Sequence, residues 1–124
     1  MTSTRHMRGS AAHAAGKEAE SHACALIAQH GFSIMARRCR TPLGEIDVVA
    51  ASPTTLIFVE VKQRRSLTEA AFALAPAQQR RVLQAADFLI HTRPEWHREA
   101  MRIDLIMRDE QGKLEWRKDV LRAF

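Results

Sequence analysis

The chain has 124 residues, of which 46% are hydrophobic and 27% are charged, and its formal net charge is +5. These values are typical of one globular domain with a substantial core. No run approaches the roughly 18–20 apolar residues that cross a bilayer, and the N-terminus lacks the apolar stretch of a secretory signal, so we expect neither membrane binding nor secretion.

The first predicted element is a helix over residues 13–30, after a lead-in of residues 1–12 that we expect to be mobile. One face of this helix is apolar, and Gly31 stands where helices commonly stop. The residues on that face are Ala19, Ala23, Leu26, Ile27 and His30. Residues 13–124 are expected to form a single domain.

Three strands are predicted to follow this helix. They cover residues 32–40, 45–51 and 56–63, and turns at residues 41–44 and 52–55 connect them. The third strand has the strongest pattern because it is rich in β-branched and aromatic residues.

A second helical region is predicted before the last two strands. A short helical turn is expected at residues 68–74 and a longer helix at 76–91, whose first turn suits Pro76. Its apolar stripe consists of Val82, Ala85, Ala86 and Leu89. The final strands are expected at 101–108 and 114–120, around a turn at 109–112. This order of elements predicts an α/β domain with a central mixed β-sheet flanked by helices.

Two acidic residues are predicted to meet between the second and third strands. If Ala51 lies opposite Leu56 in a hairpin, Asp47 lies opposite Glu60. A slip of one or two residues would change this register. Like charges in opposite positions destabilise a sheet, and a bound metal ion is one reason for a sequence to tolerate them.

The chemistry of these side chains suits a divalent cation. Carboxylate oxygens are preferred by Mg²⁺, which commonly binds one or two carboxylates together with substrate phosphate. Lys62, two residues after Glu60, would stabilise developing negative charge or orient an attacking water. The alternative is that Lys62 and Glu45 form a surface ion pair and that the two acids lie on a solvated face.

Two strings in this region resemble a known bacterial family. Residues 44–50 read GEIDVVA and residues 58–64 read FVEVKQR, and these are similar to the GEID and FVEVK signatures of the YraN-like family. That family resembles the restriction-endonuclease-like superfamily, which includes archaeal Holliday-junction resolvases. Residues 20–32, 102–106 and 114–116 are also similar to the family, so the resemblance extends from residue 16 to about residue 120.

The resemblance implies a restriction-endonuclease-like fold with a PD-(D/E)xK-type site that uses Mg²⁺ or Mn²⁺. Asp47 would match the first metal-binding acid, and Glu60 and Lys62 would match the ExK pair, so these three are the catalytic candidates. Glu20 would match an acid that the first helix directs into the site, although it would equally be an ordinary solvated helix residue. Glu45 is a further candidate metal ligand.

The helix after the ExK strand departs from the family pattern. Family members often carry a lysine early in this helix, whereas Gln78 occupies that place here. Gln78 would still form hydrogen bonds in the site, but as a neutral group. Asp104, in the fourth predicted strand, would be either another site acid or the partner of a nearby arginine, and the ion pair is favoured.

The basic residues favour a nucleic-acid partner. All but four of the 19 Lys and Arg residues are arginines, and the guanidinium group suits phosphate oxygens. A soluble surface is the alternative explanation for any single arginine. The candidate nucleic-acid contacts are Arg37, Arg38, Arg40, Arg64, Arg65, Gln78 and Arg81. No base-stacking pattern is visible, so recognition of the backbone is expected.

Three functions therefore compete. The first is a metal-dependent endonuclease that acts on DNA, including branched or junction DNA, and a homodimer would supply the substrate clamp that so small a chain lacks. The second is a non-catalytic nucleic-acid-binding module with the same fold, and the third is a structural or partner-binding protein whose ion pairs imitate a site. Cys24 and Cys39 form no CxxC pair, so reduced thiols and a cytoplasmic location are expected.

Overall fold

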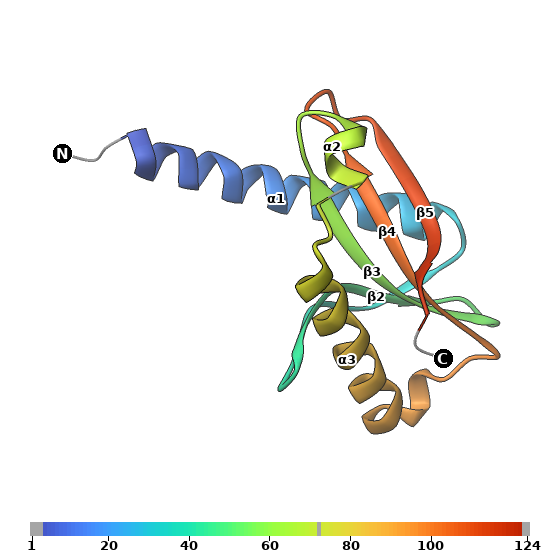
Figure 1. The fold of residues 1–124 in the computed structure, drawn as a ribbon. Coiled ribbons are helices and arrows are strands. Elements are labelled where there is room, and N and C mark those ends of the chain that lie inside the picture. Colours follow the sequence, from blue (N-terminus) through green and yellow to red (C-terminus); the bar gives the residue numbers. More distant parts are fainter. Residues whose placement is uncertain (1–3, 72, 123–124) are drawn as a thin grey trace.

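The computed structural model describes the backbone of residues 4–71 and 73–122, which form a five-stranded sheet with helices against it (Figure 1). The helices are α1 (Thr4–Gln29), α2 (Leu67–Ala71) and α3 (Pro76–Thr92), with a 3-10 turn η1 at Pro94–Trp96. The strands are β1 (Ser33–Thr41), β2 (Gly44–Ala51), β3 (Thr55–Gln63), β4 (Ala100–Arg108) and β5 (Leu114–Leu121). This is the expected α/β class, and it is consistent with a restriction-endonuclease-like fold.

The sheet is mixed, as predicted, and its strands follow chain order from β1 to β5. Neighbouring strands are antiparallel except for β3 and β4, which are parallel. The segment that returns the chain from β3 to β4 contains α2, α3 and η1. Parallel neighbours need a crossover connection of this kind, which usually contains a helix. Here the helix is α3, and it packs against the sheet.

Two apolar layers enclose β3, which explains why its sequence is almost continuously apolar. On one face α1 packs on the sheet, and on the other face α3 does (Figure 1). The α1 layer includes Ala23, Ile27, Val48, Ile57, Val59 and Ile106. The α3 layer includes Ile46, Leu56, Phe58, Val82, Ala86 and Leu89. All four residues predicted for the α3 stripe are buried.

Helix α1 begins earlier than predicted. It starts at Thr4 rather than at residue 13, so the expected lead-in is helical from Thr4 onward and residues 1–3 lie outside the described part. Helical hydrogen bonds do not require an apolar face, so a helix can begin before its apolar pattern does. The division of the chain at residue 12 remains a prediction.

The buried face of α1 also differs from the prediction. Ala19, Ala23 and Ile27 are buried as expected, but Leu26 is only partly buried and His30 is exposed beyond the helix end. Glu20 is buried in their place, with 7% of its surface exposed. The second helical turn, predicted at 68–74, is helical over Leu67–Ala71, residue 72 lies outside the description, and Leu74 is not helical.

The predicted register of β2 and β3 is confirmed by four successive pairs, from Ala51 opposite Leu56 to Val48 opposite Val59. The turn before β2 depends on Gly44, which has a φ of +157°, and a Cβ there would lie 3.1 Å from the carbonyl oxygen of Arg81 in α3. A side chain at position 44 would therefore push the β1–β2 turn away from α3.

Two further expectations concern the location of the chain. No helix in the described residues is both long enough and apolar enough to span a membrane. Cys24 and Cys39 are free and partly buried, and burial raises the pKa of each thiol above its ordinary value. Both thiols are therefore expected to react slowly near neutral pH.

Candidate active site

The paired strands β2 and β3 change their bonding where the two acidic residues meet. The regular ladder ends at Val48 and Val59. Beyond it, the Asp47 backbone N–H donates to Oε2 of Glu60 at 3.0 Å, and the Val61 N–H donates to Oδ2 of Asp47 at 2.8 Å. Each carboxylate thus accepts a hydrogen bond from the opposite strand, which fixes both acids side by side at the end of the ladder.

Glu60 is held in an environment that disfavours its charge. Only 2% of its surface is exposed, and burial, together with the nearby charge of Asp47, raises its pKa to about 8. Burial also raises the pKa of Asp47, and the charges of Glu20 and Glu45 act in the same direction. Burial and the proximity of other acids therefore disfavour the charged forms of both Asp47 and Glu60.

Lys62 and Gln78 are the groups that moderate this charge. The positive charge of Lys62 lowers the pKa of both Asp47 and Glu60, against the larger effect of burial. Nε2 of Gln78, from the first turn of α3, donates to Oε1 of Glu60 at 3.4 Å. Gln78 thus contacts the site as a neutral donor, in the manner considered from the sequence.

Glu20 approaches the same region from α1, but its oxygens have partners. Nε of Arg37 lies 3.4 Å from Oε1, and Nε of Arg38 lies 3.4 Å from Oε2. The two arginines are about half exposed, with 45% and 46% of their side-chain surface accessible. Glu20 is therefore a buried acid that pairs with two partly exposed arginines, and its charge still contributes to the raised pKa of Asp47.

The backbone at Arg38 explains how consecutive strand residues reach one acid. Side chains on a regular strand alternate between faces, yet Arg37 and Arg38 both contact Glu20. Arg38 has a φ of +50°, a left-handed conformation that costs a residue with a Cβ roughly 1–2 kcal/mol. Strain of this kind tends to be retained at functional sites. The run of arginines in the sequence does not reveal it.

The remaining candidates are more dispersed. Glu45 lies 3.6 Å from Arg40, its partner across β1 and β2, and forms no ion pair with Lys62 within the described residues. Arg65 pairs with Glu69 of α2 at 3.5 Å. Arg64 and Arg81 are exposed. The structure thus brings Asp47, Glu60, Lys62, Gln78 and Glu20 together and leaves the others around them.

Asp104 is separate from this group, and the favoured ion pair is confirmed. It is fully buried, and Arg102 donates to it from Nη2 at 3.0 Å and from Nε at 3.3 Å. Nε1 of Trp116 and the backbone N–H of Asp119 each add a bond of 2.9 Å. Asp104 is therefore a structural acid that connects β4 to β5.

The donor set of the site fits a hard divalent cation that keeps most of its water. No group of three or more His, Cys, Asp or Glu side chains in the described residues is arranged to enclose a metal. Oδ1 of the partly buried Asp47, however, accepts no hydrogen bond from the residues that the structure describes. Two adjacent carboxylates with an available oxygen suit Mg²⁺, which is commonly completed by water and substrate phosphate.

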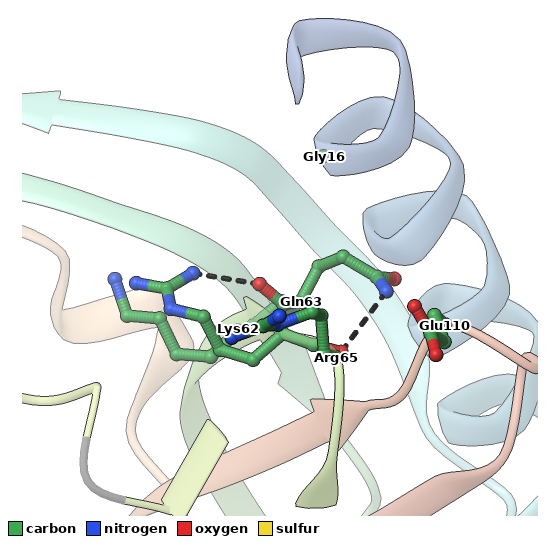
Figure 2. A pocket seen from close by; sticks show the side chains of 7 residues that line it. Gly16, Lys62, Gln63, Arg65 and Glu110 are labelled. Atoms are coloured by element: carbon green, nitrogen blue, oxygen red, sulfur yellow. Dashed lines mark hydrogen bonds between the residues drawn. The ribbon is translucent and has the colours of Figure 1, made fainter. Parts of the chain in front are cut away.

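An open pocket of about 400 Å³ lies next to the site, at the end of β3 (Figure 2). Lys62, Arg64 and Arg65 line it together with Gly16 of α1 and Glu110 of the β4–β5 turn. Sequence reasoning missed Gly16 and Glu110, because nothing in their local pattern places them beside the end of a strand 46 or more residues away.

Gln63 anchors one wall of this pocket. Its Nε2 donates to the carbonyl oxygen of Asp109 at 3.0 Å, and its Oε1 accepts from Nη1 of Arg108 at 3.2 Å. Figure 2 shows its amide directed towards Glu110. These bonds join the ends of β3 and β4 and hold the basic segment after β3 in place.

Comparison with known proteins identifies relatives along most of the chain. Residues 19–108 match the model of a family described as uncharacterised protein family UPF0102. A UPF0102 protein of Azorhizobium caulinodans is 45% identical over 87% of this chain and 82% of its own length. A UPF0102 protein of Nitrobacter winogradskyi is 46% identical over 82% of this chain and 85% of its own.

A third relative extends the match over more of the chain. A UPF0102 protein of Granulibacter bethesdensis is 40% identical over 94% of this chain and 73% of its own length. The region matched by the family model, residues 19–108, contains Glu20, Asp47, Glu60 and Lys62 of the candidate site. This chain belongs to the uncharacterised bacterial family UPF0102, the YraN-like family that its GEID and FVEVK strings resemble.

Proposed function

We propose that the chain is a Mg²⁺- or Mn²⁺-dependent endonuclease that hydrolyses phosphodiester bonds of DNA, including branched or junction DNA. The observation that carries this proposal is the adjacent pair of carboxylates, the partly buried Asp47 and the buried Glu60, beside Lys62. Burial raises the pKa of Glu60 to about 8, so its charged form opposes folding unless a cation or another ligand compensates it. Perturbed acids of this kind cluster at functional sites.

The residues have distinct roles in this reaction. Asp47 and Glu60 would hold the cation, which supplies Lewis acidity to the phosphoryl group when it is bound. Lys62 would orient the attacking water or stabilise the charge that develops on the phosphate. Water gives up a proton to solvent as its oxygen bonds to phosphorus, the bond from phosphorus to the leaving sugar oxygen breaks, and that oxygen takes up a proton from solvent. Gln78 holds Glu60 in position through its amide.

The surrounding arginines support a polyanionic substrate. Arg37 and Arg38 lie at the edge of the site and are about half exposed, so their guanidinium groups are available to phosphates. Resemblance to junction resolvases favours branched DNA among the possible substrates. A homodimer would place two sites on one symmetric junction. Light scattering with and without junction DNA tests that assembly, and a monomer under both conditions would contradict it.

The test of the function is a cleavage assay with linear, flapped and four-way DNA in Mg²⁺ or Mn²⁺. We expect metal-dependent cleavage by the wild type and a loss of about a hundredfold or more in Glu60→Gln and Lys62→Ala. Glu95→Gln is a matched control, because Glu95 is an exposed acid that pairs only with Arg93. Equal cleavage by Glu60→Gln and the control would contradict the proposal.

One observation favours a non-catalytic nucleic-acid-binding module as the second candidate. Glu20, the third acid of the region, is neutralised by Arg37 and Arg38, which leaves two acids for a cation. Binding of the same DNA panel without cleavage, unchanged by metal and by Glu60→Gln, would establish this second function and exclude the first.

A further inference from the structure

The pocket at the end of β3 has one strongly basic side. Lys62, Arg64 and Arg65 contribute three positive charges, and Glu110 contributes one negative charge. Arg64 donates to the carbonyl oxygen of Gln63 at 2.7 Å. Among the residues that the structure describes, Arg65 has only a long contact of 3.5 Å with the exposed Glu69. Neither guanidinium group is held by a buried acid, so both have donors to offer to an anion.

This pocket adjoins the candidate active site and shares Lys62 with it. Val61 lines the pocket and its N–H donates to Asp47. Lys62 also lines the pocket, and its charge lowers the pKa of Glu60. On α1, Gly16 lies four residues before Glu20, and residues with this spacing share a helix face about one turn apart. The pocket therefore lies beside the acids, next to Val61 and Lys62 at the end of β3.

The size and shape of the pocket indicate the ligand. A volume of about 400 Å³ is within the usual range for a small-molecule site, roughly 300–1,000 Å³. The pocket is open, and its wall at Gly16 carries no side chain. A Cβ at this position would have no atom within 4 Å, so there is room for a larger residue. A basic, open pocket beside a phosphodiester site suits another part of the same nucleic-acid strand.

We propose that this pocket binds the nucleotide next to the scissile phosphate, with Arg64 and Arg65 on its phosphate. The proposal rests on the proposed function in that it treats Asp47 and Glu60 as the reaction centre. Glu110, on the opposite wall, limits affinity by repelling the phosphate. The pocket thereby determines the register in which a strand enters the site.

The first test fills the pocket from its bare wall. Gly16→Phe places a large side chain where a Cβ meets nothing within 4 Å, and replacing a helix glycine does not oppose the helix. Gly16→Ala is the matched control, because its methyl group leaves most of the volume. Binding of a short fluorescent single-stranded DNA without divalent metal is measured by anisotropy. We expect about a tenfold loss for Gly16→Phe and little change for Gly16→Ala.

The second test changes the charge of the pocket. Arg65→Ala is compared with Arg122→Ala, since the two arginines are 82% and 81% exposed and each pairs with one acid. Arg122 lies at the C-terminal end of β5, away from the pocket. We expect only Arg65→Ala to weaken binding and to reduce the slope of log K against log salt by about 0.7. Glu110→Gln should tighten binding.

The outcomes separate this proposal from the proposed function. Unchanged DNA binding by Gly16→Phe and Arg65→Ala would contradict the proposal that this pocket binds a nucleotide, even if Glu60-dependent cleavage is observed. Weakened binding by both, without cleavage by the wild type, would support the pocket and contradict the nuclease. Competition of thymidine monophosphate and of inorganic phosphate with the fluorescent DNA shows which part of the nucleotide is recognised. If inorganic phosphate competes as strongly as the nucleotide, the pocket is not a nucleotide subsite.

Discussion

Glu60 and Asp104 are two buried acids on neighbouring strands whose surroundings are opposite. They are 2% and 0% exposed, and in the parallel register Glu60 lies one residue beyond the position opposite Asp104. Asp104 receives four hydrogen bonds, two of them from Arg102. Glu60 receives two and faces another acid, Asp47.

The difference shows that burial alone does not mark a functional acid. The charge of Asp104 is balanced within the fold, so this acid contributes to stability. The charge of Glu60 is opposed by burial and by Asp47, so this acid opposes folding whenever it ionises. The cation proposed above would remove this conflict by compensating the charge of Glu60. Substitutions at Asp104, at Glu60 and beside Glu20 test this difference.

The largest expected effect on stability comes from Asp104→Asn. The substitution leaves Arg102 without its counter-charge and replaces one of the two acceptor oxygens with an NH2 donor, which then faces either the Trp116 Nε1–H or the Asp119 N–H. Removing one partner of a buried pair commonly costs about 3–5 kcal/mol, and we expect about 3 kcal/mol because Arg102 is 25% exposed. Urea unfolding measures this loss, and a change within 0.5 kcal/mol would show that Asp104 is not structural.

The same isosteric change at Glu60 should have the opposite sign at high pH. The pKa of Glu60 is about 8 in the folded chain and near 4.5 in the unfolded chain, so the folded state keeps its proton longer. Between these values the free energy of unfolding falls by up to about 1.4 kcal/mol per pH unit. Glu60→Gln cannot ionise and escapes this loss.

We therefore expect metal-free Glu60→Gln to exceed the wild type in stability by about 1–3 kcal/mol at pH 8.5 and to differ little from it at pH 5. Urea midpoints at the two pH values provide the measurement. A variant that is less stable than the wild type at pH 8.5 would mean that Glu60 is held by its surroundings as firmly as Asp104.

The smallest effect concerns the strained backbone beside Glu20. Arg38→Gly removes a side chain from a residue with φ of +50°, so relief of strain should offset the lost contact with Glu20, and stability should change by less than about 0.5 kcal/mol. Arg37→Gly, at the neighbouring strand position, should cost about 1 kcal/mol. Equal losses in both variants, measured by urea unfolding, would show that the conformation of Arg38 carries no strain.

The sequence predicts the parts of the fold that depend on local pattern. The apolar stripe of α3 and the pairing of Ala51 with Leu56 follow from periodicity and a short turn, and both are confirmed. The predicted start of α1 is wrong, because residues 4–12 are helical but lack the apolar periodicity by which a sequence indicates a helix.

The candidate site was only partly predictable for a related reason. The proximity of Asp47 and Glu60 follows from the strand register, so spacing and family resemblance find it. The contacts of Glu20 with Arg37 and Arg38 need a left-handed residue that no pattern marks. The pocket joins Gly16 to Glu110, and such a long-range contact depends on the packing of α1 against the end of the sheet.

The central claim, that Asp47 and Glu60 form a cation site, is tested most directly by the thermal unfolding of the metal-free protein titrated with Mg²⁺. A ligand of the folded state stabilises it, and protons compete with the cation at Glu60. We predict that Mg²⁺ raises the unfolding temperature of the wild type and of Glu95→Gln, more at pH 8.5 than at pH 6.5, and leaves that of Glu60→Gln unchanged. An equal rise in Glu60→Gln would contradict the claim.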